Sequence, residues 1–457
     1  MMNRRELLKL LPALAIAGPL RASVGGQVSV APDMPPPADL SWWREARFGM
    51  FVHWGPVSLR GTEIGWSRGK EVPEKEYDAL YRRFNPTSFD ATAWARLAKA
   101  AGMKYLVLTT KHHDGFCLWD SRLTDYTIMS TPFRRDVVRE LAVACRREGV
   151  AFCAYYSILD WRHPDYPLGS PGGKTKKPSA DMARYTQYLK GQLTELISGY
   201  GPLGLLWFDG GWEDAWDERL GRDLYRHVRT LQPSIVVNNR VGKALEGMAG
   251  TSARGAFAAD YDTPEQQVGR YRDDRPWESC ITICKQWAWK PDDALKPLAE
   301  CLETLVTCAG GDGNLLLNVG PMPSGQIEPR QQDRLREIGR WLAVHGESVY
   351  GTRGGPWRPQ PWGVSTRKGR VAYLHVLRWP GEGALIVPQI GPRVVSARVL
   401  GGKPADVRAT AAGIEIRVAP AARQPFDTVV RLDFDGPVSQ ALARQACPHP
   451  SAGRHGL

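Results

Sequence analysis

The stretch Leu203-Gly204-Leu205-Leu206-Trp207-Phe208-Asp209-Gly210-Gly211 is an apolar run that ends in a carboxylate followed by two glycines. An apolar run of this length between glycines predicts a strand buried on both faces, as in a parallel sheet. Asp209 then stands where the strand leaves the core, and in a barrel of alternating strands and helices such strand ends form the floor of the active site. A competing interpretation is that Asp209 caps the next helix, because Asp is a preferred cap and Glu213 follows in the first-turn region.

Apolar strand-like runs and amphipathic helix-like segments alternate along most of the chain. The predicted strands cover residues 47–55, 104–110, 152–157, 203–209, 235–240, 278–283 and 314–320. The predicted helices cover residues 90–102, 135–148, 181–198, 215–231, 297–308 and 329–344. Steady alternation is typical of repeated parallel crossovers, and so many units favour closure into a barrel. We therefore predict an α/β fold, a (β/α)8-type (TIM-like) barrel over residues 41–350.

After Pro356 the pattern changes to short runs in which apolar and polar residues alternate. These runs cover residues 371–377, 384–388, 394–400, 414–418 and 428–434. Their spacing predicts a C-terminal antiparallel β-sandwich domain over residues 351–437. A polar tail that contains Gly and Pro follows over residues 438–457, and we expect it to be flexible.

The N-terminal residues have the pattern of an export signal. Paired Arg4 and Arg5 precede an apolar segment over residues 10–20. We interpret residues 1–26 as a twin-arginine-like signal peptide and the Pro-rich residues 27–40 as a spacer. The apolar segment is too short for a stable membrane span, so we expect a periplasmic or secreted bacterial protein.

The composition of the 457-residue chain is that of an ordinary globular protein, with 43% hydrophobic and 24% charged residues. This length suits one barrel-sized domain and a smaller one. The net charge of +12 comes without a long basic run, so we expect no nucleic-acid partner. The eight cysteines show no Cys-x-x-Cys spacing, and we expect most of them to be small buried core residues.

Several polar side chains fall at or just beyond the ends of the predicted strands, so that one concave face of the barrel collects them. They are His53, His112, His113, Tyr156, Asp209 and Arg240. The set offers partners for several hydroxyl groups and at least one nucleophile. His112, His113 and Asp114 also suggest a metal site, because imidazole and carboxylate are usual ligands. Adjacent residues point in different directions, so we favour hydrogen bonding to a polyol over metal binding.

Hydrolysis of a glycosidic bond with retention requires two carboxyl groups about 5 to 5.5 Å apart, one nucleophilic and one acting as acid/base. Asp209 supplies one of them. The candidates for the other follow the strand of Arg240: Glu265 in a loop, where reactive groups can reach over a pocket, and Glu278 at the start of a predicted strand. Spacing alone does not choose between these two glutamates.

Four motifs are specific enough to identify a family. They are Phe48-Gly49-Met50-Phe51-Val52-His53-Trp54-Gly55, Thr110-Lys111-His112-His113-Asp114-Gly115-Phe116, Leu206-Trp207-Phe208-Asp209-Gly210 and Leu315-Leu316-Leu317-Asn318-Val319-Gly320-Pro321. Together they resemble the α-L-fucosidases of glycoside hydrolase family 29, and the similarity extends over residues 42–357. The resemblance implies a catalytic barrel with a C-terminal β-sandwich, a retaining mechanism, and no requirement for a metal or other cofactor.

The resemblance also implies roles for the matching residues. Asp209 is expected to be the nucleophile that forms a covalent fucosyl-enzyme. Glu265, in Thr263-Pro264-Glu265, is expected to be the acid/base, with Glu278 as the runner-up. The expected substrate-binding residues are His53, Trp66, His112, His113, Tyr156, Trp207, Arg240 and Trp287, with Tyr155 in place of Tyr156 if the register shifts by one.

The implied function is that of an exo-acting α-L-fucosidase (EC 3.2.1.51), which removes terminal α-linked L-fucose from a fucosylated oligosaccharide or glycoconjugate. The chain departs from the family pattern at Gly65, where Glu is common, and at Asn239, where Asp is common. Two alternatives stay open: a barrel glycosidase for another sugar such as galactose, and a sugar-binding protein without turnover. The presence of both Asp209 and Glu265 argues against a protein that only binds.

Overall fold

The computed structural model describes residues 34–171, 175–381 and 383–439. The predicted signal peptide, part of the predicted spacer and almost all of the predicted tail lie outside these residues. Within the described ranges, no helix is long and apolar enough to cross a membrane.

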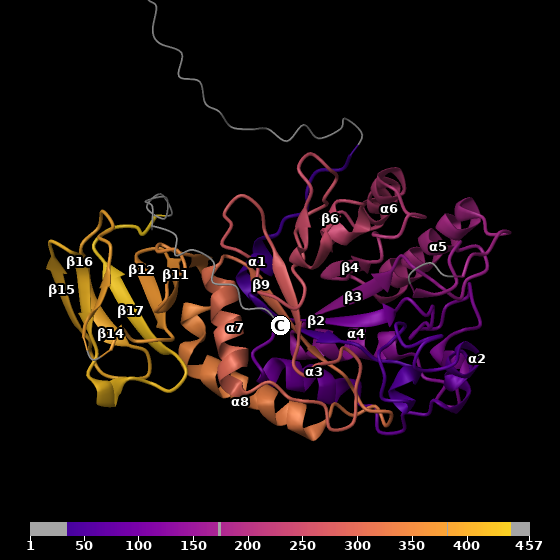
Figure 1. The fold of residues 1–457 in the computed structure, drawn as a ribbon, viewed down its shortest axis with the longest axis horizontal. Helices are drawn as coiled ribbons and strands as arrows, with labels where there is room; N and C mark the ends of the chain where they lie inside the picture. Colours follow the sequence, from indigo (N-terminus) through magenta and orange to yellow (C-terminus); the bar gives the residue numbers. More distant parts are fainter. Residues whose placement is uncertain (1–33, 172–174, 382, 440–457) are drawn as a thin grey trace, which may run out of the picture. The chain divides into compact units, whose positions relative to one another are not determined.

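Seven parallel strands form the central sheet, in the order β5-β4-β3-β2-β1-β9-β8. Figure 1 labels β2, β3, β4 and β9 of this sheet. Their bounds are β1 (Phe48–Val52), β2 (Tyr105–Lys111), β3 (Ala151–Ser157), β4 (Leu205–Asp209), β5 (Val236–Val237), β8 (Glu278–Thr282) and β9 (Asn314–Val319). Every residue of β1, β2, β4, β8 and β9 is buried. Burial on both faces explains why these strands read as continuous apolar runs rather than as alternating ones.

An irregular segment over residues 260–266 fills the space between the edge strands β5 and β8. Parallel bridges join Tyr261 of this segment to Asn238 on one side, and Glu265 to Cys280 of β8 on the other. The Cys280 N–H also donates to the Pro264 carbonyl. The segment thus takes the place of an eighth strand, and the barrel that the sequence predicts is confirmed.

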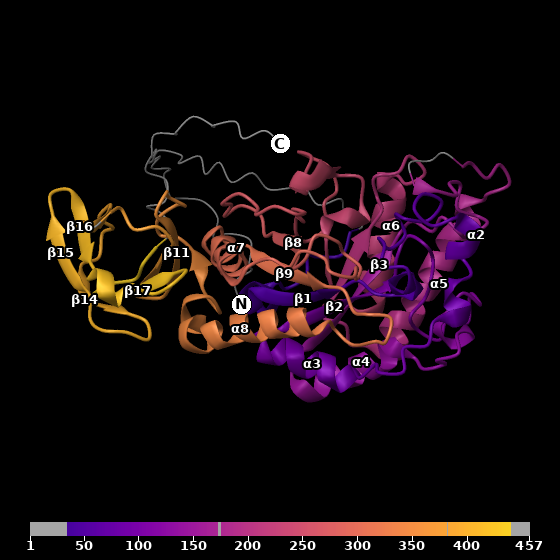
Figure 2. The same ribbon diagram turned by 60° about the horizontal axis from the view of Figure 1, so that its bottom comes forward.

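Helices alternate with these strands along the chain. The helices after the first strand are α2 (Glu74–Tyr77), α3 (Ala91–Ala100), α4 (Val137–Glu148), α5 (Met182–Tyr200), α6 (Glu218–Leu231), α7 (Leu298–Gly310) and α8 (Pro329–His345). Neighbouring helices pack on one another, α3 on α4 and α8, and α5 on α6 (Figure 2). Asp217 caps α6, accepting a hydrogen bond from the Leu220 N–H at 2.7 Å. The interpretation of Asp209 as the cap of this helix is therefore wrong.

The amino-terminal end of the barrel is closed by aromatic side chains. Trp43, from the short helix α1 (Ser41–Ala46), packs against Tyr261 with ring centroids 4.6 Å apart. Its indole N–H donates to Glu278, the first residue of β8, at 3.2 Å. Because parallel strands share their direction, this end lies opposite to the one where Asp209 ends β4.

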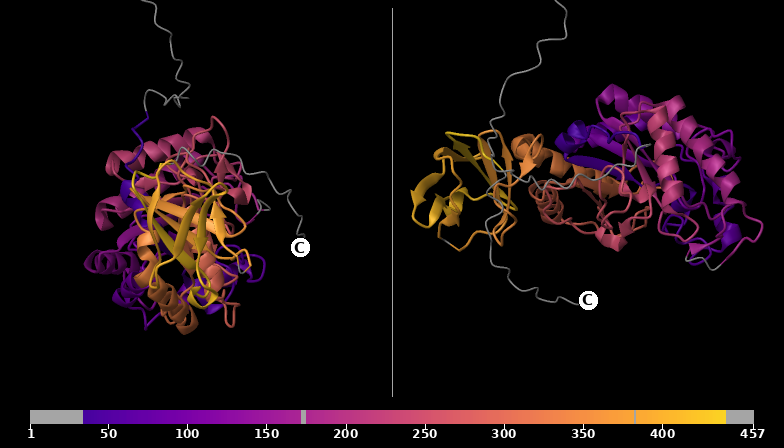
Figure 3. Two further views of the ribbon diagram at one scale, coloured as in Figure 1. Left: turned by 90° about the vertical axis from the view of Figure 1, so that its left-hand side faces the viewer. Right: turned by 90° about the horizontal axis from the view of Figure 1, so that it is seen from above.

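The C-terminal region contains two antiparallel sheets, in the orders β10-β11-β12-β17-β14 and β13-β16-β15 (orange to yellow in Figure 3). The strands are β10 (Arg353–Gly354), β11 (Gly363–Lys368), β12 (Val371–Val376), β13 (Leu385–Val387), β14 (Val394–Val399), β15 (Asp406–Thr410), β16 (Gly413–Arg417) and β17 (Thr428–Phe434). Apolar residues of both sheets, such as Leu374 and Ile416, form one buried cluster between them. This is the predicted sandwich, with β10, β11 and β15 as strands that the sequence pattern did not reveal.

Candidate active site

A cavity of about 290 Å³ opens at the carboxyl ends of the barrel strands. Its lining residues come from seven separate parts of the barrel, as expected for a site built from strand ends and the loops that follow them. They are Phe51, His53, Trp66, His112, His113, Tyr155, Trp207, Asp209, Trp212, Arg240, Leu245, Gly247, Met248, Glu265, Cys280 and Trp287. Most of the predicted site residues are among them.

Asp209 is the last residue of β4, and its carboxylate is held in place by three donors. The Tyr155 hydroxyl donates to its Oδ2 at 3.0 Å, and Arg240 Nη1 donates to its Oδ1 at 2.9 Å. The backbone N–H of Gly210 also donates to Oδ1, at 3.1 Å. With its side chain 12% exposed, the Asp209 carboxyl group is held in one place and still faces the cavity.

Arg240 joins the two predicted catalytic carboxyl groups. Its Nη1 bonds Asp209, and its Nη2 bonds Glu265 Oε2 at 2.8 Å. Its Nε donates to Thr263 Oγ1 at 2.8 Å, so all three nitrogens are engaged. Burial acts to lower the pKa of Arg240, but the Asp209 and Glu265 carboxylates outweigh it and raise that pKa above its ordinary value. A permanent cation therefore holds both carboxyl groups at one cavity.

Glu265 lies in the irregular segment that completes the barrel, and two backbone contacts fix its position. Its N–H donates to the Met248 carbonyl at 2.9 Å, and the following Gln266 N–H donates to the Cys280 carbonyl at 3.0 Å. The Glu265 side chain is 20% exposed, more than that of Asp209. Of the two carboxyl groups, Glu265 is thus the one nearer to the solvent.

The hydrogen bonds of His53 set its tautomer. The Asn318 side-chain amide donates from Nδ2 to the Trp287 carbonyl at 2.8 Å, which leaves its Oδ1 as an acceptor 2.7 Å from His53 Nδ1. His53 Nδ1 therefore carries the proton. Burial lowers the pKa of His53 to about 3, so the ring is neutral and its Nε2 is an acceptor.

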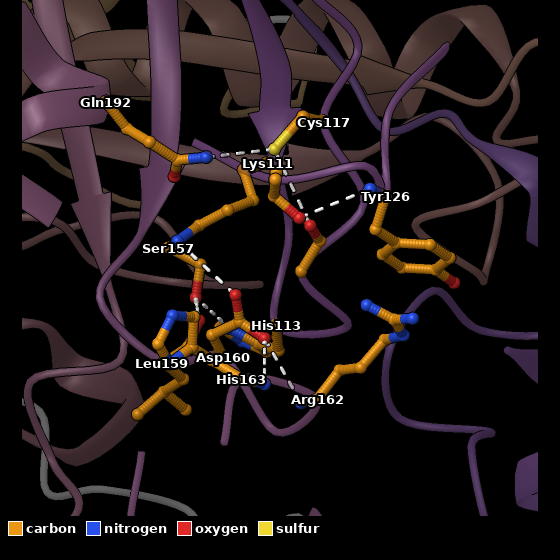
Figure 4. A network of polar contacts seen from close by, with 12 residues as sticks. Lys111, His113, Cys117, Tyr126, Ser157, Leu159, Asp160, Arg162, His163 and Gln192 are labelled. Carbon is orange, nitrogen blue, oxygen red and sulfur yellow. Dashed lines mark hydrogen bonds and ion pairs between the residues drawn. The ribbon is translucent and has the colours of Figure 1, made fainter. Parts of the chain in front are cut away.

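His113 has the same arrangement with different partners (Figure 4). The Ser157 hydroxyl donates to the Leu159 carbonyl at 2.7 Å, so its oxygen accepts from His113 Nδ1 at 2.7 Å. Burial is the main cause that lowers the pKa of His113 to about 3. The free lone pair of His113 Nε2 lies 3.7 Å from Asp209 Oδ2.

These assignments make the cavity rich in acceptors. His53 Nε2, His113 Nε2 and the Asp209 carboxylate all accept hydrogen bonds, whereas the main donor, Arg240, is already engaged. A ligand that suits the cavity must therefore bring several O–H donors of its own. His112 adds a buried Nδ1 that has no hydrogen-bond partner among the described residues, and its ring stacks on Tyr155 at 5.4 Å.

Aromatic side chains form the rest of the wall. Phe51 and Trp207 are almost fully buried, and Trp287 packs on the His53 ring at 4.8 Å. Trp66 stands at the mouth, 36% exposed, with its ring nearly parallel to that of Trp212. A flat ligand with one apolar face fits such a wall.

Two predicted site residues do not reach the cavity, and the first is Tyr156. Successive side chains of a strand point to opposite faces, so Tyr156 turns away from the barrel interior and bonds Gln192 and Lys111, at 2.7 and 3.0 Å. Its neighbour Tyr155, the alternative for a register shifted by one, lines the cavity instead.

The second is Glu278, the runner-up for the acid/base. It is fully buried at the closed end of the barrel, where Trp43, Tyr105 and Trp207 donate to its carboxyl group. Burial is the main cause that raises the pKa of Glu278 to about 7. Because it is fully buried and does not line the cavity, it is not placed to contact a substrate.

The suggested grouping of His112, His113 and Asp114 does not form either. Asp114 Oδ2 accepts from the Tyr77 hydroxyl at 2.7 Å, and its Oδ1 accepts from the Phe116 N–H. Across residues 34–171, 175–381 and 383–439, no group of three or more His, Cys, Asp or Glu side chains is placed to hold a metal ion.

Sequence reasoning missed several lining residues. Phe51 and Cys280 lie inside predicted strands, and Trp212 follows the glycine pair after Asp209. Their positions next to strand ends were the available signal. Leu245, Gly247 and Met248 belong to a short hairpin whose sequence carries no chemical signal at all.

A barrel whose strand ends carry two carboxyl groups bridged by one arginine, around a small cavity that suits a polyol, is a glycoside hydrolase in its architecture. A family model described as Alpha-L-fucosidase matches residues 37–347. The tissue alpha-L-fucosidase of Macaca fascicularis is 32% identical over 380 residues, which cover 76% of each chain. The chain therefore belongs to the α-L-fucosidase family of glycoside hydrolases, EC 3.2.1.51, and the resemblance seen in its motifs is confirmed.

Solved structures agree with this family. Alpha-L-fucosidase isoenzyme 1 from Paenibacillus thiaminolyticus is similar with a TM-score of 0.78 and 36% identity, over 87% of this chain and 98% of that one. An alpha-L-fucosidase from Bacteroides thetaiotaomicron, trapped as a covalent intermediate, is similar with a TM-score of 0.78 and 28% identity, over 89% and 99%.

Proposed function

We propose that this protein is an exo-acting, retaining α-L-fucosidase that removes terminal α-linked L-fucose from a fucosylated oligosaccharide or glycoconjugate. The observation that carries the proposal is the Arg240 guanidinium, which bonds Asp209 at 2.9 Å and Glu265 at 2.8 Å in one cavity. Two carboxyl groups on neighbouring nitrogens of one guanidinium are close, as double displacement requires.

In the first step, the Asp209 carboxylate attacks C1 of the fucosyl group while Glu265 gives its proton to the glycosidic oxygen. The C1–O bond to the leaving group breaks, and a covalent fucosyl-enzyme forms on Asp209. In the second step, Glu265 takes a proton from water, the oxygen of that water attacks C1, and the bond to Asp209 breaks. Fucose leaves, and both carboxyl groups return to their starting states.

The environments of the two carboxyl groups suit these roles. Asp209 is less exposed and is held by Arg240, Tyr155 and the Gly210 N–H, which fixes its direction of attack. Glu265 lies closer to the solvent, where a leaving group departs and water arrives. Position within the cavity thus supports the assignment of nucleophile and acid/base.

The remaining lining residues suit one small deoxysugar. The neutral His53 and His113 accept from sugar hydroxyls, and His112 lies between them for a further contact. The apolar wall that includes Phe51 and Trp287 suits the methyl group of fucose, because a hydroxymethyl group placed there loses its hydrogen bonds to water.

The test is hydrolysis of 4-nitrophenyl α-L-fucoside beside the matching galactosides. We expect turnover of the fucoside, with α-L-fucose as the first product seen by proton NMR. Turnover of a galactoside but not of the fucoside supports the alternative function, a barrel glycosidase that acts on another sugar. Binding of fucose without turnover of any substrate supports the sugar-binding protein, and initial release of β-L-fucose contradicts retention.

We also propose that the protein is exported to the periplasm or secreted through its twin-arginine-like signal. The support is the pair Arg4 and Arg5 before an apolar segment. Replacement of both arginines by lysine is expected to leave the protein in the cytoplasmic fraction of a bacterial host. Unchanged export of that variant contradicts the proposal.

A further inference from the structure

A short hairpin beside the cavity is tied to Glu265. It consists of β6 (Leu245–Glu246), β7 (Thr251–Ser252) and the turn between them. The Met248 carbonyl accepts from the Glu265 N–H at 2.9 Å, and the Gly250 carbonyl accepts from the Thr263 N–H at 3.0 Å. The turn and the segment of Glu265 are therefore held side by side by their backbones.

Gly250 makes this close contact possible. A Cβ atom at this position would lie 1.9 Å from the Thr263 carbonyl oxygen, well inside van der Waals contact, and the residue has a φ of 62°. Only glycine meets both conditions without displacing the neighbouring backbone. The backbone of Met248 is thus held in a fixed position relative to that of Glu265.

The place of Glu265 indicates which part of the bound substrate meets this hairpin. A general acid must lie within hydrogen-bond reach of the oxygen that it protonates, which here joins the fucosyl group to the leaving group. The cavity wall next to Glu265 therefore faces the leaving group. Leu245 and Met248 supply that wall, and Met248 is 51% exposed.

A second apolar group stands at the mouth of the same cavity. Trp212 is 37% exposed, and its ring lies 5.5 Å from that of His113. Its backbone is held because Lys243 Nζ donates to the carbonyls of Trp212 and Glu213, at 2.8 and 2.7 Å. The deep aromatic residues Phe51 and Trp207 are at most 2% exposed, so exposed apolar surface in this cavity is concentrated at the mouth.

We propose that Met248, with Trp212, forms a leaving-group subsite that takes a ring with an apolar face, either an aryl ring or the C–H face of a neutral pyranose. This inference rests on the proposed fucosidase function. The lining residues of the hairpin carry no charge, so the subsite offers apolar contact and no ionic contact to the group beyond the glycosidic oxygen.

The experiment compares two substrates with reactive leaving groups, 4-nitrophenyl α-L-fucoside and α-L-fucosyl fluoride. Fluoride is too small to reach the hairpin, so the ratio of the two kcat/KM values measures contact with the ring. In Met248→Ser we expect the ratio of aryl fucoside to fluoride to fall about fivefold, as for loss of part of one apolar side-chain contact. Met248→Leu is expected to restore most of the ratio.

Ile386→Ser is the matched control, because Ile386 is 48% exposed and lies in the C-terminal sandwich. Its ratio is expected to equal that of the unaltered protein. If Met248→Ser leaves the ratio of the two kcat/KM values unchanged, or lowers both kcat/KM values equally, the proposed subsite is wrong. Absence of turnover of both substrates by the unaltered protein instead contradicts the fucosidase function itself.

Discussion

The two ends of the barrel each hold a carboxyl group in contact with aromatic residues, yet the two groups differ in their partners. Asp209, at the open end, bonds the cation of Arg240. Glu278, at the closed end, bonds neutral donors instead: the indoles of Trp43 and Trp207 and the hydroxyls of Tyr105 and Tyr261. Both carboxyl groups lie among aromatic side chains, so burial does not separate them. The difference lies in their hydrogen-bond partners: a cation for the group suited to catalysis, and neutral donors for the group in the core.

Trp207 connects these two environments. Its indole N–H donates to Glu278 at 3.2 Å, while the Arg240 guanidinium lies over its ring at 4.7 Å. Contact with an aromatic ring adds to the attraction that holds Arg240 in place. Glu278 thus supports the wall of the cavity through Trp207 without reaching the cavity itself.

The largest expected effect separates the two ends directly. Asp209→Ala removes the proposed nucleophile, so kcat for 4-nitrophenyl α-L-fucoside is expected to fall by about 10³-fold or more. Glu278→Gln keeps the size of the side chain, and its kcat is expected to fall by less than about tenfold. Steady-state kinetics of both variants check this, and a larger loss in Glu278→Gln would break the comparison.

The second effect concerns the choice between the two glutamates. Glu265→Ala removes the proposed general acid, and a general acid contributes about 10²- to 10⁴-fold. We expect the loss to be large for a fucosyl disaccharide and small for α-L-fucosyl fluoride, because fluoride needs less help from a proton. Added azide is expected to restore part of the activity. If Glu278→Gln shows this dependence on the leaving group, Glu265 is not the acid/base.

The third effect compares two neighbouring tyrosines of β3 whose side chains point to opposite faces of the strand. Tyr155 and Tyr156 are neighbours on β3, but only Tyr155 bonds Asp209. Tyr155→Phe is expected to lower kcat/KM about tenfold or more, since a hydrogen bond to a charged group contributes about 1.5 to 3 kcal/mol.

Tyr156→Phe is the matched comparison on the same strand. We expect it to lower the free energy of unfolding by about 1 to 2 kcal/mol, because Lys111 and Gln192 lose a buried partner. Its kcat/KM is expected to change by less than threefold. Equal kinetic losses in both variants would show that the hydroxyl of Tyr155 has no special role.

The smallest effect is a pH dependence of stability at the closed end. The pKa of Glu278 is raised to about 7 in the fold from an ordinary value of 4.5, with burial as the main cause. The folded protein therefore binds more protons than the unfolded chain between these values, and stability falls as the pH rises from about 4.5 to about 7.

Glu278→Gln removes this titration. We expect the Tm of the variant, relative to the unaltered protein, to rise by a few degrees between pH 4.5 and pH 8. Thermal unfolding at the two pH values measures this difference. If the Tm difference between the variant and the unaltered protein is the same at both pH values, or falls as the pH rises, Glu278 is not protonated in the folded protein at low pH.

Sequence patterns within single segments are enough to predict the barrel strands, the position of Asp209 and the family. The apolar runs define the barrel strands because a strand buried on both faces has no polar side. Asp209 was found in the same way, since the end of β4 can be read from the glycines that follow it. The four motifs likewise identify the family, which the comparisons confirm.

Only the tertiary structure decided what depends on contacts between distant segments. The proposal of Glu265 rather than Glu278 as the acid/base rests on which end of the barrel each glutamate occupies. The segment over residues 260–266 is placed by isolated bridges to Asn238, Trp277 and Cys280, which its sequence pattern does not reveal. The choice of Tyr155 over Tyr156 depends on a register of one residue, which turns a side chain to the opposite face. The sequence does not indicate that Met248 lies at the cavity. Its position depends on a backbone hydrogen bond with Glu265, which the identity of the side chains does not reveal.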